Sequence, residues 1–172
     1  MMEEKISFIG HHGTLYVNSK KIKREGFEES KSGWLGKGIY FFEDDKELAR
    51  MWANYKKGTY QSKIDVIECN ISLEQEKILD IVDPKSVHSK MINEFRENFL
   101  KVTLKENKII KTEDTTLDGK ILDMICNRKG YSLVRNSTHT LTESDRKLGI
   151  KFSNLKNGIE LCVKDKNIID II

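Results

Sequence analysis

A glycine-rich loop leads directly into an aromatic strand between residues 33 and 42, and this segment constrains the fold more than any other. Gly33, Gly36 and Gly38 allow positive φ angles and let the backbone approach another group closely. The rest of the segment is apolar and aromatic, and burial in a strand alone would explain it. A flat ligand ring held between the strand and the glycine backbone would explain both the glycines and Tyr40. The glycine spacing excludes a Walker loop and a Rossmann fingerprint.

Helices and strands alternate along the chain without a regular βαβ order. Helices are predicted at 17–27, from Asp44 through Tyr55, at 86–106 and at 117–129. Strands are predicted at 6–14, 38–42, 64–71, 78–83, 131–135, 158–163 and 168–172. The first strand is expected to end in a glycine turn at His11-His12-Gly13-Thr14, and the polar stretch 136–147 is expected to be a loop. This mixture predicts an α+β fold.

Composition limits the class of protein. The chain has 172 residues, one proline and no Gly/Ser/Pro-rich linker, which predicts one domain over 1–172. No apolar run reaches the roughly 18 residues of a membrane helix. The N-terminus lacks the regions of a secretory signal, so we expect a cytoplasmic protein with no membrane partner. Cys69, Cys126 and Cys162 are scattered, which predicts neither a disulfide framework nor a metal site.

Two further motifs carry groups that can take part in chemistry. His12 precedes Gly13-Thr14, where an imidazole and a flat glycine backbone can meet a ligand, although such a histidine is commonly a turn residue. His11 is the alternative for the same role. Glu160 is the one carboxylate in the apolar strand 158–163, where strand alternation alone would make it a solvent-facing side chain.

Together and in this order, the three motifs resemble the His-Tyr-Glu class of ADP-ribosyltransferases, the superfamily of the poly(ADP-ribose) polymerases and diphtheria-type toxins. The resemblance is carried by His12-Gly13-Thr14, by Gly36-Lys37-Gly38-Ile39-Tyr40-Phe41 and by Glu160 with Leu161-Cys162-Val163 behind it. Between about 57 and 157 only the order of elements is compatible. The resemblance implies a split, mostly antiparallel β-sheet with flanking helices, an NAD cleft between its halves, and 86–130 as an insertion or flanking layer.

The resemblance also implies roles for the matching residues. His12 would hydrogen-bond the adenosine ribose of NAD, and Gly13, with Thr14 beside it, would bind the nicotinamide carboxamide through its backbone. Tyr40 would stack on the nicotinamide ring, and Glu160 would bind the 2′-hydroxyl of the nicotinamide ribose. Breaking the glycosidic bond develops oxocarbenium character, which a carboxylate in a dry site stabilises. NAD is therefore the expected co-substrate, and no metal is required.

Two positions depart from the polymerase pattern. Leu48 stands where polymerase members have a Ser that contacts the nicotinamide amide, and Met51-Trp52 stands where they have a second stacking Tyr. Trp52 would supply the second stacking face, although core packing explains it equally well. Gly38 would complete the NAD-binding loop.

The expected function is transfer of one ADP-ribose from NAD to a macromolecule, with release of nicotinamide. The net charge of +3, and Arg135 with His139 in or beside the polar stretch, slightly favour RNA or DNA over protein as the acceptor. A polar stretch such as 136–147 is more commonly a solvated loop than a binding site. The chain resembles a bare bacterial or phage catalytic domain, which by analogy implies a toxin or phage-defence role and a neutralising antitoxin.

Two alternatives stay open. An NAD-dependent RNA 2′-phosphotransferase also carries His-Gly-Thr, but it needs basic residues on an RNA phosphate and does not use the Tyr40 strand. A non-catalytic module that binds NAD or ADP-ribose would have no need for Glu160. Both are ranked below the transferase.

Overall fold

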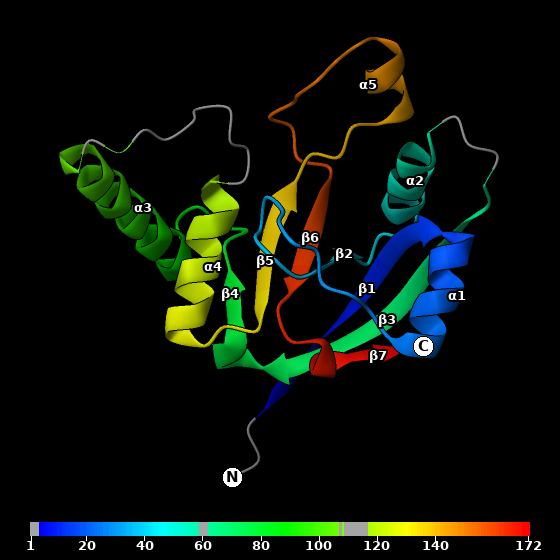
Figure 1. Cartoon of the computed structure of the whole chain (residues 1–172), viewed down its shortest axis with the longest axis horizontal. Coiled ribbons are helices and arrows are strands. Elements are labelled where there is room, and N and C mark those ends of the chain that lie inside the picture. The colour runs from blue at the N-terminus through cyan, green and yellow to red at the C-terminus, as the bar shows by residue number, and fades with distance from the viewer. Residues whose placement is uncertain (1–3, 59–61, 107, 109–116) are drawn as a thin grey trace.

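The computed structural model describes residues 4–58, 62–106, 108 and 117–172, and its fold is α+β, which confirms the predicted class. In these residues a seven-stranded sheet is accompanied by five α-helices (Figure 1). The strands are β1 (Lys5–Leu15), β2 (Ile39–Glu43), β3 (Ile64–Glu74), β4 (Ile78–Asp80), β5 (Leu133–Thr138), β6 (Gly158–Val163) and β7 (Ile169–Ile171). The helices are α1 (Tyr16–Glu25), α2 (Lys46–Lys57), α3 (Val87–Lys105), α4 (Leu117–Lys129) and α5 (Glu143–Lys147), with 3₁₀ turns at Gln75–Lys77 and Lys166–Ile168.

The two parts of the sheet meet at a short junction between β1 and β2. The strand order is β4-β5-β6-β2-β1-β3-β7, and every neighbouring pair is antiparallel except β4 and β5. β1 pairs with β3 along its whole length, whereas its registered pairs with β2 are Gly10–Glu43 and His11–Phe42. Figure 1 shows β1 and β3 running obliquely to the upright β5 and β6. The sheet is continuous, and its shortest strand pairing is the one between β1 and β2.

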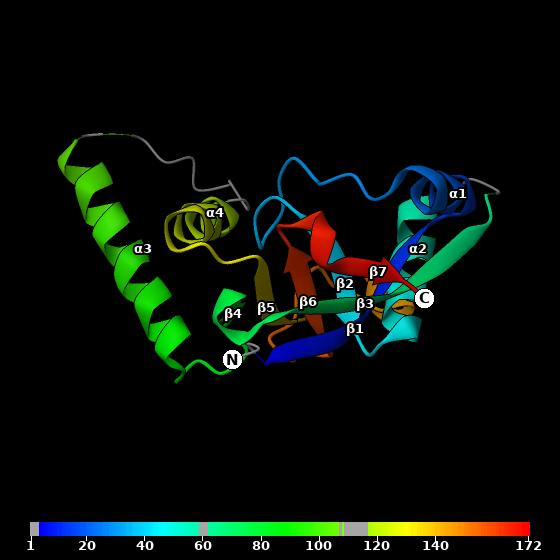
Figure 2. The same ribbon diagram turned by 90° about the horizontal axis from the view of Figure 1, so that it is seen from below.

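The strand side chains form two faces, which we call the Phe41 face and the Tyr40 face. The cross-strand pairs Phe41–Leu161 and Tyr40–Cys162 fix the assignment, because directly opposite residues share a face. The Phe41 face carries Ile39, Phe41, Ile67, Cys69, Ile71, Leu133, Leu161 and Val163 and is covered by Phe27 and by Ile22 of α1. The Tyr40 face carries Tyr40, Leu79, Val134 and Cys162 beneath α4 and α3, and Phe42 and Val66 beneath α2. Figure 2 shows α4 between α3 and the sheet.

Local capping explains where most helices begin and end. The side chains of Asp45 and Ser86 accept backbone N–H groups at the starts of α2 and α3. Gly26 and Gly130, with φ of +86° and +75°, follow α1 and α4, as the glycine positions predict. In the described part of the chain, none of the helices has both the length and the apolar character needed to span a membrane.

The glycine turn predicted at residues 11–14 is wrong, because β1 continues through these residues to Leu15. Gly13 instead lies where α2 crosses the strand. A Cβ at Gly13 would lie 1.9 Å from the Ala49 carbonyl oxygen, so the glycine makes room for the helix backbone.

The loop predicted at 136–147 is also wrong. β5 extends to Thr138, and α5 begins after Thr142. The Thr142 hydroxyl accepts the Asp145 N–H while the Asp145 carboxylate accepts the Thr142 N–H, which is a capping box. A Thr followed three residues later by an acidic side chain was a local signal for this helix.

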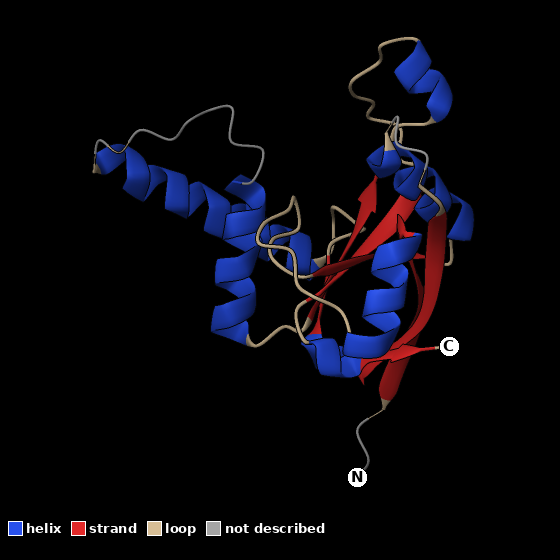
Figure 3. Ribbon diagram, turned by 45° about the vertical axis from the view of Figure 1, so that its right-hand side comes forward, coloured by secondary structure: helices blue, strands red, loops and turns tan. Residues whose placement is uncertain are grey.

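Residues 139–157, which we call the excursion, project beyond the end of the sheet and contain α5 (Figure 3). Asn157 joins the two ends of the excursion. Its N–H donates to the Thr138 carbonyl at 2.9 Å, and its side-chain amide forms two hydrogen bonds of 2.8 Å with the backbone of Thr140. The excursion therefore leaves the sheet through a closed neck.

Candidate functional site

The Tyr40 hydroxyl holds the glycine-rich loop against the sheet. It donates a hydrogen bond to the Gly36 carbonyl at 2.7 Å and accepts the Leu35 N–H at 3.0 Å. A Cβ at Gly33 would lie 2.1 Å from the Tyr40 hydroxyl oxygen, so a side chain at this position would displace one partner. The glycines therefore permit close contact between the loop and the tyrosine.

A lysine and an aspartate clamp the same loop from the other side. Lys164, directly after β6, donates from Nζ to the carbonyls of Leu35 at 2.7 Å and Lys37 at 2.6 Å, and to Asp123 Oδ1 at 2.9 Å. Asp123 of α4 accepts the Lys37 N–H through both oxygens at 3.0 Å. Gly36 has φ +90°, and a Cβ there would lie 2.1 Å from Asp123 Oδ1. The loop backbone is thus preorganised.

The Tyr40 ring is half-buried, and its phenol is neutral. Burial raises the pKa of Tyr40 far above its ordinary value, and the nearby Glu160 carboxylate raises it further. A neutral aromatic ring that keeps part of its surface exposed can stack against a flat ligand ring.

Glu160 lies on the Tyr40 face, opposite Phe42 of β2 and Asn136 of β5. The indole N–H of Trp34, from the glycine-rich loop, donates to Glu160 Oε2. Burial raises the pKa of Glu160 to about 7, while the Trp34 hydrogen bond acts in the opposite direction. A carboxyl group that titrates near neutral pH therefore lies beside Tyr40, and such perturbed groups gather at functional sites.

His12 lies where β1 leaves β2. Its ring packs edge-on against Phe27 and Phe41, with centroid distances of 5.3 and 5.7 Å. Nδ1 is 2.8 Å from the Tyr40 carbonyl oxygen, so Nδ1–H donates to it. Burial lowers the pKa of His12, so the ring is neutral and Nε2 keeps its lone pair. His12 thus links β1 to β2 just beyond their last backbone pair and offers a hydrogen-bond acceptor.

The structure brings Tyr40 and Glu160 onto one face of the sheet, but the His12 ring starts from the other. His12 is opposite Ile67, a residue of the Phe41 face, whereas Glu160 is opposite Phe42. His12 therefore lies on the opposite face of the sheet from Tyr40 and Glu160.

His11, the alternative histidine, belongs to the Tyr40 face but is covered. It lies in a cross-strand row made of Glu68, His11, Phe42, Glu160 and Asn136. Its side chain is almost fully buried, with Nε2 3.2 Å from Glu68 Oε2, and Nδ1 has no hydrogen-bond partner among the described residues. His12, by contrast, keeps part of its surface exposed.

Gly13 and Thr14 lie on the part of β1 that has passed its last registered pair with β2. In the described sheet this part of β1 pairs with β3 alone, so one backbone edge is open. Gly38 has φ +152°, and a Cβ there would lie 2.5 Å from the Val163 carbonyl oxygen. Its observed role is close packing against β6.

Trp52 of α2 is half-buried against the cluster of Phe42, Leu48 and Ala49. Its ring centroid lies 5.7 Å from that of Tyr55, and Lys56 Nζ lies 5.0 Å from it. The side chain therefore takes part in helix packing, and the second stacking face stays a prediction.

Arg135 is neutralised by two carboxylates. It forms a bidentate pair with Glu43 at 2.6 and 2.9 Å and a third bond to Asp80 at 2.8 Å. It lies opposite Leu161, on the face away from Glu160. A pocket of about 430 Å³ on this side is lined by Asp80, Val82, Asp83, Ser86, Val87, His88 and Arg135. Acceptor binding by Arg135 stays a prediction.

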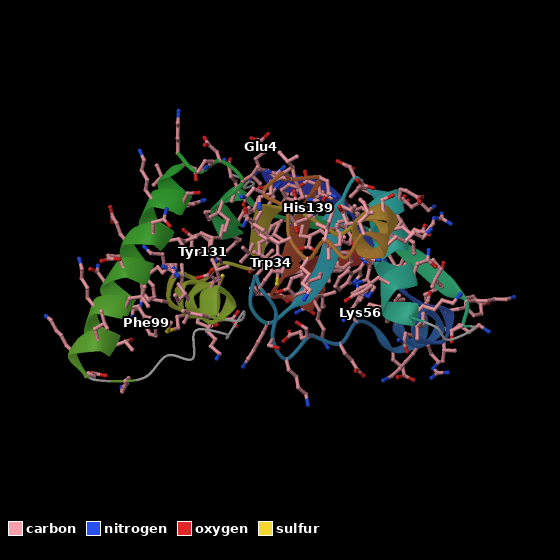
Figure 4. The ribbon with its side chains drawn as sticks, turned by 90° about the horizontal axis from the view of Figure 1, so that it is seen from above. Glu4, Trp34, Lys56, Phe99, Tyr131 and His139 are labelled. Carbon is pink, nitrogen blue, oxygen red and sulfur yellow. The ribbon has the colours of Figure 1, made fainter. Side chains whose placement is uncertain are left out.

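His139 begins the excursion and holds it together. Its Nδ1–H donates to the Leu155 carbonyl at 2.6 Å, and Nε2 lies 3.5 Å from Asp145 Oδ2. Figure 4 labels His139 and Trp34, which come from different segments of the chain. Contact of His139 with an acceptor stays a prediction.

Within the described residues, no group of three or more His, Cys, Asp or Glu side chains is arranged to hold a metal ion. In comparisons with protein families, curated proteins and solved structures, nothing matches this chain. The resemblance to ADP-ribosyltransferases therefore depends on the sequence motifs alone.

Three residues at the site have no role in the sequence prediction: Trp34, Asp123 and Lys164. Trp34 lies inside the glycine-rich segment that the sequence analysis singles out. Nothing in the sequence predicts its hydrogen bond to Glu160. Asp123 reaches the loop because α4 packs beside it, and Lys164 reaches it because the end of β6 pairs with the start of β2 at Ile39–Val163. Gly119 was a local signal for the packing of α4, since a Cβ there would lie 2.0 Å from the Gly33 carbonyl oxygen.

Proposed function

We propose that the protein is an ADP-ribosyltransferase of the His-Tyr-Glu class, which transfers ADP-ribose from NAD to a macromolecule and releases nicotinamide. The observation that carries the proposal is Glu160. This carboxyl group has a pKa raised to about 7 by burial and shares a sheet face with the half-buried Tyr40 ring. His12 reaches the adjoining junction through its hydrogen bond to the Tyr40 carbonyl.

The junction also supports the finer fold proposal, a split sheet with NAD between its halves. β1 and β2 share the pairs Gly10–Glu43 and His11–Phe42 and then separate. A ligand between the separating strands would meet the open edge of β1 and side chains from both faces. One NAD molecule can then contact side chains from both faces of the sheet.

Each residue has a role that suits its chemical state. Neutral His12, with Nδ1–H bound to the Tyr40 carbonyl, accepts a hydroxyl of the adenosine ribose at Nε2. The backbone of Gly13 binds the nicotinamide carboxamide, with Thr14 beside it. Tyr40 stacks on the nicotinamide ring, and Trp52 covers its second face.

Glu160 acts on the ribose. The bond between ribose C1′ and the nicotinamide nitrogen breaks, and its electron pair returns to the pyridinium ring, which leaves as neutral nicotinamide. The ribose gains oxocarbenium character, and the Glu160 carboxylate holds the 2′-hydroxyl and stabilises the positive charge. A nucleophile on the acceptor then bonds to C1′ and gives its proton to solvent. Because the carboxylate must be ionised, turnover rises with pH through about 7.

For the acceptor we propose RNA or DNA rather than protein, and a single transfer. The net charge of +3 supports a nucleic acid. Arg135 and His139 already bind carboxylates and a carbonyl within the chain, so an acceptor phosphate would have to compete with those groups. We further propose a cytoplasmic location, and, by analogy with the toxins of this class, a toxin or phage-defence role with a neutralising antitoxin.

The test is incubation of the full chain with NAD labelled in the adenylate phosphate, together with RNA, DNA and lysate protein. We expect nicotinamide release and label on nucleic acid, both strongly reduced in Glu160→Gln. Neither product with the wild-type chain would overturn the proposal. Release of ADP-ribose 1″,2″-cyclic phosphate from 2′-phosphorylated RNA would identify the phosphotransferase instead, and tight NAD binding without turnover would identify a binding module.

A further inference from the structure

Trp34 projects from the clamped loop onto Glu160. The loop backbone is fixed on both sides of it, because Gly33 lies against the Tyr40 hydroxyl and the Leu35 N–H donates to the same oxygen. The indole N–H donates to Glu160 Oε2. Trp34 is 37% exposed, so solvent reaches part of the residue. Figure 4 labels Trp34 near the middle of the molecule, between α4 and α2.

The Glu160 carboxylate has more acceptor capacity than Trp34 uses. Two carboxylate oxygens offer about four lone-pair positions. The indole N–H occupies one position, on Oε2. A ribose hydroxyl can therefore bind the carboxylate while the Trp34 bond persists, and that bond restricts the side chain to one orientation.

We propose that Trp34 is a positioning residue for the reaction: its indole N–H orients Glu160 and favours its ionised form, with one oxygen left for the ribose of NAD. The proposal rests on the proposed function, in which Glu160 binds the 2′-hydroxyl. Trp34 acts through Glu160 and differs in this from Tyr40, which would touch the nicotinamide ring.

The surroundings of Glu160 give Trp34 this influence. The side chains that face it from the neighbouring strands are Phe42, Asn136 and the neutral phenol of Tyr40, and none of them is a cation. Burial favours the protonated form of Glu160, whereas the Trp34 N–H favours the ionised form. Removing the N–H while keeping the ring would therefore raise the pKa of Glu160.

Trp34→Phe is the variant that makes this change, because it keeps an aromatic cover and removes the donor. In the pH profile of kcat/KM for nicotinamide release, we expect the acid limb to shift to higher pH by about one pH unit. Activity would then fall roughly tenfold at pH 6 and return to within about twofold of wild type at pH 9. A merely structural role would lower activity equally at every pH, and that result would overturn the proposal.

Trp52→Phe is the matched control, since Trp34 and Trp52 are the two tryptophans of the chain. Trp52 would contact NAD directly, so we expect Trp52→Phe to change KM and to leave the acid limb at the wild-type pH. A shift of the limb in Trp52→Phe as large as in Trp34→Phe would overturn the proposal, because the effect would then not come from the Glu160 hydrogen bond.

Fluorescence tests the Trp34–Glu160 contact without turnover. In Trp52→Phe the emission comes from Trp34 alone, and we expect it to titrate with a midpoint near pH 7, the pKa of Glu160. The transition should disappear in Trp52→Phe/Glu160→Gln; its persistence there would overturn the proposal. If wild type releases nicotinamide and Trp34→Phe leaves the limb in place, Trp34 fails and the proposed function stands. No release by wild type sinks the proposed function, and with it the role of Trp34 in the reaction.

Discussion

Replacing Glu160 with Gln removes the charge of the carboxyl group and keeps its shape. The amide oxygen can still accept the Trp34 N–H, so the side chain keeps its orientation. A neutral amide does not stabilise the oxocarbenium charge, and interactions made mainly in the transition state affect turnover more than affinity. We expect NAD affinity within a fewfold of wild type and turnover lower by roughly 10²–10³, the loss seen when one electrostatic stabiliser is removed.

The pKa of about 7 adds a second quantity to this prediction. Such a group is about 9% ionised at pH 6 and about 91% ionised at pH 8, so wild-type turnover should rise roughly tenfold between them. The residual turnover of Glu160→Gln should not follow this curve. A flat profile in the variant would identify Glu160 as the titrating group.

Stability should change in the opposite direction. The folded chain holds the Glu160 proton more tightly than the unfolded chain, in which a Glu titrates near about 4.3. Wild type therefore loses stability as the pH rises from the unfolded pKa towards about 7, while Glu160→Gln has no such loss. The melting temperature of the variant should exceed that of wild type at pH 8, and the difference should close towards pH 4.

Nicotinamide release at pH 6 and 8, calorimetric titration with NAD and thermal melts measure these three effects. Near-full turnover of Glu160→Gln would refute the assignment of the catalytic carboxylate to β6. Glu143 would be the next candidate. It lies on α5, exposed and paired with Lys147 at 2.6 Å, and that pairing lowers its pKa, so it would have no acid limb near pH 7.

Substitutions at three further positions test the site and its support. Tyr40→Ala should weaken NAD binding by about 1–3 kcal/mol in calorimetry. Tyr40→Phe should keep most of the affinity but lose about 1–3 kcal/mol of unfolding free energy in urea, because the hydroxyl no longer holds the loop. Equal NAD affinities for the two variants would contradict stacking. Gly13→Ala places a methyl group 1.9 Å from the Ala49 carbonyl oxygen and should destabilise by about 1–3 kcal/mol or more in urea, so wild-type stability would exclude this packing. Arg135→Ala leaves the largely buried Glu43 carboxylate without its bidentate partner and should lower the unfolding free energy by about 1–3 kcal/mol. A change near zero would count against the pair.

Local patterns predicted the elements whose signals lie within the element itself. Gly26 and Gly130 marked the ends of α1 and α4, and the aromatic run marked β2. The turn at Gly13 failed because a glycine that permits a turn also permits a helix to cross a strand, and only the position of Ala49 distinguishes the two. The helix after Thr142 was missed because polar composition outweighed its capping pair.

The site could be predicted as a set of residues but not as a geometry. Motif spacing pointed to Tyr40 and Glu160, which the β2–β6 register brings to one face. The opposite face of His12 depends on its pairing with Ile67, and strand register is set by tertiary contacts that no local pattern records. The clamp of the glycine loop by Lys164 depends in the same way on elements distant in sequence.

The neck at Asn157 closes the excursion, which contacts α2 where Arg146 lies 3.8 Å from the centre of the Tyr55 ring. Thr138 and Thr140 are hydrogen-bonded to Asn157, so the segment between Thr140 and Asn157 is a loop whose two ends are fixed. Doubling the length of such a loop changes its closure free energy by only about 0.6 kcal/mol. The span also exposes Phe152 and Leu155, which take no part in the buried clusters. Evolution or engineering can therefore replace this segment with one of different length and chemistry while the sheet that carries Glu160 stays the same.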